Sequence, residues 1–544
     1  MKQITKILAL TALVIAAASC SASRAEQMKL AESVDVSCAP EVLALKGDRI
    51  PADITVTFPA KYFHPQAIME VTPVLVYEGG EQAARTFTYQ GDKVKDNYPV
   101  IASDVAGSVS ESVSFEYVPG VEKSYLELRC VAYYKDKTID IPAIKVADGC
   151  NVTQLFATKK GEFSYKQDAY QHVISESTEG QVMYDYNSAT IKNSELRSQS
   201  VKELQAAIEE ITSDPRYTVK GTRIVAYASP EGGQEYNAKL SDKRAESAKK
   251  AWDKVTGGMK ADDLEIRSMG QDWDGFREAV ENSDLEDKDL ILRVLSMYSD
   301  PAVRESEIRN MSKVYTEINK NVFPELRRAR FIADIDYQNF SDAELKELAD
   351  KAIDVLDEEG LLRVAAITDD AARKAEIYRI AYSKYASDRA AFNLAILSLN
   401  ASDPAQAASY LKSVKKTDAD VLNAKGVCEL QNGNLDEAAK LFRQSGSTEA
   451  RANLGTIDLL KGDYASAVKN LEGTDSHNLA VAYILTDQLD KAEKAITCNC
   501  ARSNYLRAVI AARRGNASDV QKYLDKAGNL KARAEKDVEF ADFR

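Results

Sequence analysis

From Ser341 to Arg544 the sequence shows no strand pattern and repeats one helical-hairpin motif five times. A small residue recurs in the first helix of each repeat, at steps of 31, 29, 25 and 28 residues. Small residues at a fixed position let neighbouring helices approach closely, so the pattern predicts a stacked helical array over residues 341–544. A generic helical bundle is the alternative. The recurring positions are Ala395, Gly426, Gly455, Ala480 and Ala508 in the first helix, and Ala408, Ala438, Ala467 and Ala492 in the second.

Residues 33–158 have the opposite character, because short runs of alternating polar and apolar residues are separated by turn residues. Residues 54–58 and 113–117 alternate in this way, and residues 126–134 and 138–146 are expected to form a hairpin. About seven such strands predict an antiparallel β-sandwich of general immunoglobulin-like build.

Residues 180–337 mix both patterns in the order β-α-β-α-β, followed by a charged helical insert over residues 272–324 and a final strand. The segment Ala226–Lys250 is central, since an apolar strand ends there in a Ser-Pro-Glu-Gly-Gly turn and an amphipathic helix follows. A turn between a strand end and a helix start gathers free backbone N–H groups. We therefore expect an anionic or zwitterionic ligand at this turn.

The N-terminus predicts export. Residues 1–20 combine a basic start with an apolar run too short to span a bilayer, and residues 21–32 form a polar tether. The small residues before Cys20 resemble the lipobox of bacterial lipoproteins, which implies lipidation of Cys20; an ordinary signal with an incidental cysteine is the alternative. No other apolar run approaches membrane length, so a lipid anchor is the expected membrane contact.

Charge and residue usage exclude several function classes. A formal net charge of −13 leaves no basic excess to neutralise phosphates, so nucleic acid is not an expected partner. His64, His172 and His477 lie far apart in the sequence and lack neighbouring nucleophile or metal-ligand spacing, so we expect no enzyme activity, cofactor or metal.

Six cysteines remain once Cys20 is set aside. A disulfide between two of the cysteines in the β region is expected, with its connectivity open. The other three are interpreted as thiols in helix cores, in preference to a metal site that would include His477. The first group is Cys38, Cys130 and Cys150, and the second is Cys428, Cys498 and Cys500.

Two family resemblances follow from these motifs. The helical repeats resemble the tetratricopeptide repeat in a shorter form. The middle domain resembles the OmpA-like, peptidoglycan-associating domain, since Tyr236-Asn237-x-x-Leu240-Ser241-x-x-Arg244-Ala245 reproduces that family's YNxxLSxxRA run. That family grips the diaminopimelate of the peptide stem with this arginine and with an aspartate in a GHTD turn. The resemblance places Ser229 at the aspartate position and implies a site of Ser229, Glu231, Asn237 and Arg244.

The combined prediction is a multidomain chain of β-sandwich, OmpA-like α+β domain with helical insert, and all-α array. It implies a non-catalytic outer-membrane lipoprotein facing the periplasm, which contacts the peptidoglycan peptide stem and holds envelope or fimbrial proteins on the concave face of the array. The combination resembles a Bacteroidetes envelope variant, some members of which sit beside fimbrial genes. The alternative is an assembly factor for surface appendages or secretion whose OmpA-like domain no longer binds peptidoglycan.

Overall fold

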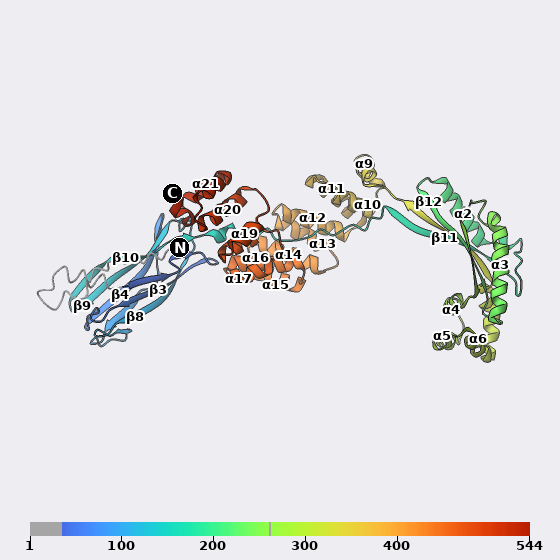
Figure 1. Cartoon of the computed structure of the whole chain (residues 1–544), viewed down its shortest axis with the longest axis horizontal. Helices are drawn as coiled ribbons and strands as arrows, with labels where there is room; N and C mark the ends of the chain where they lie inside the picture. Colours follow the sequence, from blue (N-terminus) through green and yellow to red (C-terminus); the bar gives the residue numbers. More distant parts are fainter. Residues whose placement is uncertain (1–34, 261–262) are drawn as a thin grey trace. The chain divides into compact units, whose positions relative to one another are not determined.

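The computed structural model describes residues 35–260 and 263–544, which form two compact units (Figure 1). Unit 1 comprises the chain up to residue 167 together with residues 370–544, and unit 2 comprises residues 168–369. The predicted signal, Cys20 and the tether lie outside the described residues. Within the described residues, no helix is long and apolar enough to cross a membrane.

The N-terminal part of unit 1 is β-rich, as predicted. One sheet has the strand order β1-β3-β8, and a second has the order β2-β10-β9-β4-β6-β7, with β5 paired to β4. The predicted hairpin is confirmed, since β9 and β10 pair antiparallel from Tyr134 and Lys137 onward. The strands are β1 (Asp35–Ala39), β2 (Val42–Ala44), β3 (Arg49–Phe58), β4 (Ala67–Tyr77), β5 (Gly80–Ala83), β6 (Phe87–Gly91), β7 (Val100–Ile101), β8 (Gly107–Glu116), β9 (Ser124–Tyr134) and β10 (Lys137–Asn151).

Apolar side chains from both sheets form one core, in which Ile50, Phe115 and Leu126 are almost completely buried. The disulfide expected in this region is wrong, because Cys38, Cys130 and Cys150 are separate free thiols buried in that core. Burial raises the pKa of the Cys130 and Cys150 thiols to about 12, so they behave as small apolar groups.

The C-terminal part of unit 1 is helical throughout the described residues, in agreement with the sequence pattern. A Cβ on Gly426 would lie 2.5 Å from the Phe442 ring of the next helix, which explains why the repeat keeps a small residue there. The helices are α11 (Ala371–Tyr385), α12 (Asp388–Asn400), α13 (Pro404–Ser413), α14 (Ala419–Asn432), α15 (Leu435–Ser445), α16 (Thr448–Lys461), α17 (Tyr464–Leu471), α18 (His477–Leu485), α19 (Leu489–Ala495), α20 (Ala501–Arg513) and α21 (Ala517–Lys526), followed by short 3₁₀ turns η4 (Gly528–Glu535) and η5 (Val538–Phe543).

Unit 2 is built on a four-stranded sheet of order β11-β14-β12-β13, in which β12 and β13 are parallel and the other pairs antiparallel. Val201 and Leu204 of one helix and Ala248 and Trp252 of another are buried against this sheet. The strands are β11 (Val173–Met183), β12 (Tyr217–Ala228), β13 (Leu264–Gln271) and β14 (Arg328–Gln338), and the two helices are α2 (Gln199–Ser213) and α3 (Gln234–Val255).

The helical insert between β13 and β14 has an apolar core of its own, which includes Phe276, Ile318 and Phe323. Its helices are α4 (Trp273–Glu281), α5 (Lys288–Met297), α6 (Pro301–Asn310), α7 (Ser312–Asn321) and α8 (Phe323–Leu326). Unit 2 also contains α9 (Asp342–Lys351) and α10 (Glu358–Ala366), so its compact fold continues past residue 341, where the helical array was expected to begin.

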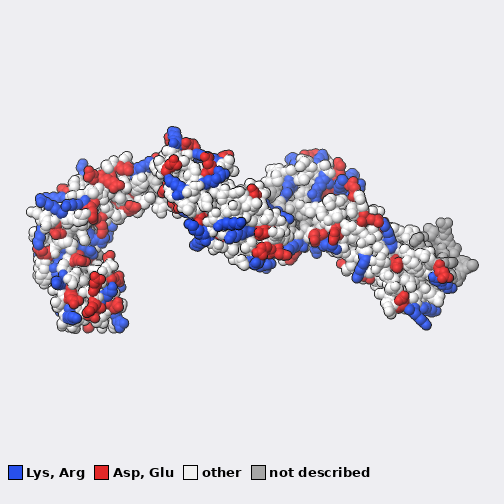
Figure 2. Space-filling model, turned by 180° about the vertical axis from the view of Figure 1, so that it is seen from behind, with Lys and Arg blue, Asp and Glu red and all other residues white. Residues whose placement is uncertain are grey.

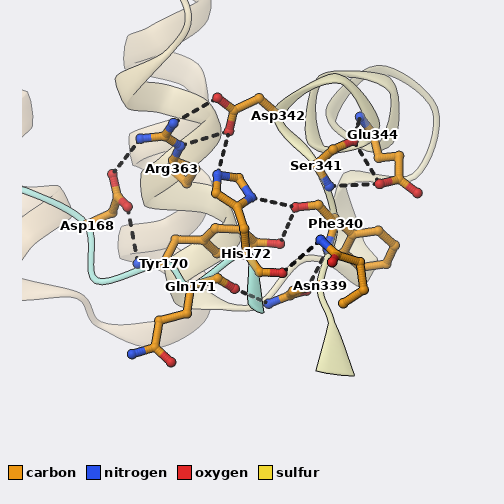
Figure 3. Close-up of polar contacts among 11 residues, drawn as sticks. Asp168, Tyr170, Gln171, His172, Asn339, Phe340, Ser341, Asp342, Glu344 and Arg363 are labelled. Carbon is orange, nitrogen blue, oxygen red and sulfur yellow. Dashed lines mark hydrogen bonds and ion pairs between the residues drawn. The ribbon is translucent and has the colours of Figure 1, made fainter. Parts of the chain in front are cut away.

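Hydrogen bonds and ion pairs explain why α9 and α10 belong with the sheet (Figure 3). Arg363 of α10 bonds the carboxylate of Asp342 through two nitrogens, at 2.9 and 2.8 Å. His172 lies beside β11 with Nε2 3.4 Å from Asp342 Oδ1, and Tyr170 donates a hydrogen bond to the Phe340 carbonyl. The segment entering unit 2 and the helices leaving it are therefore tied together at one end of the β11–β14 pair.

Charged side chains of both signs are interspersed over the face drawn in Figure 2. Exposed ion pairs are common among the described residues, such as Arg129 with Glu81 and Arg514 with Asp490. Such pairs contribute little to stability, on the order of 0–1 kcal/mol each.

Candidate functional site

A segment of extended chain crosses the first helices of the repeats in unit 1. We call residues 158–167 the strap; they connect the β domain to unit 2 and carry neither helix nor strand. Buried asparagines from four successive repeats face the strap: Asn393 of α12, Asn423 of α14, Asn453 of α16 and Asn478 of α18. The face of the helical array that carries these asparagines therefore already holds a segment of the chain itself.

Three of these asparagines each form hydrogen bonds with both the backbone N–H and the backbone carbonyl of one strap residue. At Thr158, the N–H donates to Asn478 Oδ1 at 2.8 Å and the carbonyl accepts from Asn478 Nδ2 at 2.9 Å. Asn453 makes the same pair with Glu162, at 2.7 and 2.8 Å, and Asn393 makes it with Lys166, at 2.8 and 2.9 Å.

The fourth asparagine, Asn423, adds hydrogen bonds at Glu162, the middle of the three bound strap residues. Asn423 Nδ2 also donates to the Glu162 carbonyl at 2.9 Å, and its own oxygen accepts from Asn453 Nδ2 at 2.9 Å. The gripped residues are four apart, so in an extended chain they present the same side to the helices. Backbone recognition of this kind holds an extended peptide with little regard to its sequence.

Side-chain contacts fix the register of the strap on the helices. Lys166 Nζ lies 2.6 Å from Asp418 and 2.7 Å from Asp420, and Ser164 Oγ donates to Glu449 at 2.6 Å. Gly161 has φ +82°, and a Cβ there would lie 2.7 Å from Val427. The strap is thus fitted to this one register.

The predicted ligand residues of unit 2 lie around the turn between β12 and α3. Ser229 Oγ donates a hydrogen bond to Glu231 Oε1 at 2.8 Å, and Arg327 Nη2 lies 2.7 Å from the same oxygen. Asn237 Nδ2 donates to the carbonyls of Glu231 and Gly232 at 3.1 and 3.0 Å, which holds the turn in shape. We call Ser229, Glu231, Asn237 and Arg327 the turn cluster.

Arg244 lies beside the turn cluster and is 1% exposed. Its guanidinium donates to the carbonyls of Ser188, Tyr227 and Asp185 at 3.0, 2.8 and 3.2 Å. Burial lowers the pKa of Arg244 to about 10, which still leaves it charged at neutral pH. An arginine has five N–H groups, so two remain without a partner among the residues that the structure describes.

The helical insert and the end of β13 cover the turn. The Gly232 N–H donates to Glu305 Oε1 of α6 at 3.0 Å, and Gln271 Nε2 of β13 donates to the Gly232 carbonyl at 2.9 Å. Ser229 and Asn237 are only 4% and 2% exposed. Of the four side chains predicted to bind a ligand, Ser229, Asn237 and Arg244 are therefore buried and Glu231 is half-buried. Ser229 and Glu231 bond to one another, whereas Asn237 and Arg244 bond backbone carbonyls.

A model of the OmpA family matches residues 183–286. These residues are an OmpA-family domain. No similar protein was found among curated proteins. Among solved structures, the chain is similar to the Cut9–Hcn1 hetero-tetramer of the APC/C, with 15% identity over 37% of this chain and 45% of that chain and a TM-score of 0.31. It thus spans less than half of that protein.

Two further solved structures are similar over a comparable part of the chain. One is a tetratricopeptide repeat protein from Parabacteroides merdae, with 16% identity over 36% of this chain and 89% of that chain and a TM-score of 0.28. The other is PilF of Pseudomonas aeruginosa, with 16% identity over 37% of this chain and 97% of that chain and a TM-score of 0.26.

Within the OmpA-family domain, the structure brings the four predicted residues into one region but gives them different roles. The carboxylate of Glu231 reaches the hydroxyl of Ser229, so negative charge is present beside the position that the aspartate was expected to occupy. Arg244 ties the loop at Asp185–Ser188 and the end of β12 to α3, a role that its place in the motif did not reveal.

The asparagines were missed, although a signal for them exists in the sequence. Asn393, Asn423, Asn453 and Asn478 stand two or three residues before the small residue by which the repeats are aligned. A polar side chain recurring at one position of an otherwise apolar helix face indicates a shared partner.

Proposed function

We propose that this protein is a non-catalytic scaffold of the cell envelope. Lipid attached at Cys20 tethers it to the outer membrane on the periplasmic side, and the OmpA-family domain contacts peptidoglycan. The match of the OmpA family to residues 183–286 carries this proposal. In the sheet order β11-β14-β12-β13 the start of β14 pairs with the end of β12, so Arg327, just before β14, lies beside Glu231 in the turn that follows β12.

The turn cluster suggests how a zwitterionic peptide stem is recognised. An ammonium group binds at the Glu231 carboxylate, next to Ser229, while a carboxylate binds the remaining N–H groups of Arg244 and the guanidinium of Arg327. Because Ser229 and Arg244 are buried and the side chains of Arg327 and Glu231 are only 11% and 9% exposed, binding requires the insert to release Gly232 from Glu305.

The low exposure of the turn cluster favours a second candidate function. The turn cluster is internally paired, since Glu231 already has Arg327 as its partner and Ser229 supplies no charge of its own. On this interpretation the OmpA-family domain is a structural or protein-binding module, and the protein serves the assembly of surface appendages or secretion machinery.

Protein partners in either case bind surfaces of the helical array that the strap leaves free. The asparagine-bearing face is filled by residues 158–167, so a partner contacts the second helices of the repeats or competes with the strap.

Sedimentation with purified peptidoglycan tests the two functions. We would use the chain from residue 21 and compare wild type with Glu231→Gln, Ser229→Asp and Glu235→Gln. Glu235 lies exposed in the first turn of α3, so its change is chemically identical to Glu231→Gln but outside the turn cluster. Loss of one charge-assisted contact, worth about 1.5–3 kcal/mol, weakens binding roughly 10- to 100-fold.

The proposal expects wild type and Glu235→Gln to sediment with the wall and Glu231→Gln to remain in solution. Sedimentation of Ser229→Asp alone would establish the second candidate, a wall-binding fold whose site is disabled. If none of the four proteins sediments, the peptidoglycan contact is refuted.

A further inference from the structure

Four polar side chains of the last two repeats converge on one point in unit 1. His477 is the first residue of α18, Cys498 and Cys500 lie in the turn before α20, and Ser503 lies in the first turn of α20. The sequence-based interpretation of Cys498 and Cys500 as helix-core thiols is wrong, because both are exposed, whereas Cys428 is buried in α14 as expected.

All six distances among the four groups are short. His477 Nε2 lies 3.4 Å from Cys498 Sγ and 3.5 Å from Cys500 Sγ, and the two sulfurs are 3.2 Å apart. Ser503 Oγ lies 2.9 Å from His477 Nε2 and 3.1 and 3.4 Å from the sulfurs of Cys498 and Cys500. The four atoms are therefore the corners of a small tetrahedron.

Hydrogen bonding alone does not account for this arrangement. The Nε2 of a histidine carries either one proton or one lone pair, so it can make one good hydrogen bond, yet three polar atoms lie within 3.5 Å of it. Each sulfur likewise faces the other sulfur as well as the imidazole and the hydroxyl. A cation at the centre would satisfy all four groups at once.

The spacing agrees with tetrahedral coordination. Bonds of about 2.3 Å to sulfur and 2.0 Å to nitrogen place neighbouring ligand atoms roughly 3.3–3.8 Å apart around zinc. The nitrogen–sulfur distances of 3.4 and 3.5 Å match the roughly 3.5 Å expected for that pair, whereas the sulfur–sulfur distance of 3.2 Å is shorter than the roughly 3.8 Å between two zinc-bound sulfurs, so the thiolates would move apart slightly on binding. Two thiolates and one imidazole also match the preference of zinc for sulfur and nitrogen ligands.

We propose that His477, Cys498 and Cys500 bind one zinc-class divalent cation, with the Ser503 hydroxyl at the fourth corner. Two thiolates neutralise the two charges of the ion, and the buried Ser503 excludes solvent from the fourth position. The ion ties the start of α18 to the turn between α19 and α20. It therefore stabilises the last two repeats, against which η4 and η5 pack.

Metal titration of the chain from residue 21, reduced and freed of metal with a chelator, tests this proposal. Co²⁺ serves as the probe, because thiolate-to-cobalt charge transfer and the visible bands of tetrahedral Co²⁺ report ligand type and geometry. We expect one equivalent to bind, to be displaced by Zn²⁺, and to raise the melting temperature of the array.

Variants separate the site from other thiols and imidazoles. Loss of an outer-shell partner alone costs about 10–100-fold in metal affinity, so loss of a ligand in Cys500→Ser or His477→Gln is expected to cost more. Cys428→Ala and His172→Gln remove the same groups elsewhere and should retain one equivalent. Ser503→Ala should keep the charge-transfer band, because both thiolates remain.

Three results would overturn the assignment. The first is a wild-type protein whose thiols titrate as reduced but which binds no stoichiometric Co²⁺. The second is equal binding by wild type and by the Cys498→Ser/Cys500→Ser double variant. The third is a Cys498–Cys500 disulfide that persists under reductant.

Discussion

Replacement of Asn453 by alanine should release the middle of the strap. Asn453 is fully buried, and among the described residues its side-chain oxygen is the acceptor for the Glu162 N–H, at 2.7 Å. The Glu162 carbonyl keeps a second donor, Asn423 Nδ2, at 2.9 Å. The variant therefore leaves one N–H unpaired, removes one of two donors from a carbonyl, and takes away the Asn453 donor to Asn423 Oδ1.

These losses set the expected size of the effect. An unpaired buried N–H costs about 1–3 kcal/mol, and a lost second donor about 0.5–1.5 kcal/mol. A sum of roughly 3 kcal/mol corresponds to an opening equilibrium about 100-fold larger. Asn423→Ala removes a second donor from the Glu162 carbonyl and one of two acceptors from Asn453 Nδ2, and it leaves neither group unpaired, so we expect about a fivefold to tenfold change.

Hydrogen exchange of strap amides measures this opening directly, since it reports local unfolding below the global transition. Peptides covering residues 158–167 should exchange about 100-fold faster in Asn453→Ala than in wild type. Asn432→Ala is the matched control, because Asn432 is exposed on the same array. Equal exchange in wild type and Asn453→Ala, or equal acceleration in Asn432→Ala, would refute the assigned role of the asparagines.

Two further changes test other contacts. Arg244→Ala leaves the carbonyls of Asp185, Ser188 and Tyr227 without their donor, so unit 2 should lose about 3 kcal/mol and its melting temperature should fall by roughly 6–12 °C. Both tryptophans, Trp252 and Trp273, lie in unit 2, so tryptophan fluorescence reports the unfolding of this unit. If the melting temperature falls no further in Arg244→Ala than in the exposed variant Arg267→Ala, the predicted loss of stability is contradicted. Burial raises the pKa of Glu162, because the docked strap favours the neutral form of this carboxyl. The carboxyl therefore stabilises docking below that pKa, and the stabilisation is lost as pH rises through it. Glu162→Gln should therefore slow strap exchange at pH 7 and flatten its pH dependence, and an unchanged pH profile would exclude this carboxyl as the cause.

The parts of this fold that follow from local periodicity could be predicted from the sequence. Alternation predicted the β9–β10 hairpin, the 3.6-residue period predicted α3, and the spacing of small residues predicted the helical array. In each case the residues that carry the signal are neighbours in the sequence or repeat at a fixed step.

The contacts that define the sites could not be predicted in this way. Each asparagine of the array bonds to a strap residue between 227 and 320 positions away, and no sequence pattern in either segment predicts which segment it contacts. Likewise, Glu305 of the insert reaches back 73 residues to Gly232. The turn between α19 and α20 brings Cys498 and Cys500 to His477, although α19 separates them in the sequence.

Release of the strap should remain a local event, because other contacts within unit 1 hold the β domain to the array. Gln154 Nε2 donates to the Leu460 carbonyl at 3.1 Å, Tyr464 donates to the Leu45 carbonyl at 2.8 Å, and Asn151 Nδ2 donates to Glu539 at 2.6 Å. None of these involves residues 158–167. Fast exchange in the strap of Asn453→Ala should therefore leave the amides of β9 and β10 protected as in wild type. If those strands lose protection together with the strap, the asparagines hold unit 1 together as one cooperative structure, and the strap is a structural element that a competing peptide cannot displace without unfolding the unit.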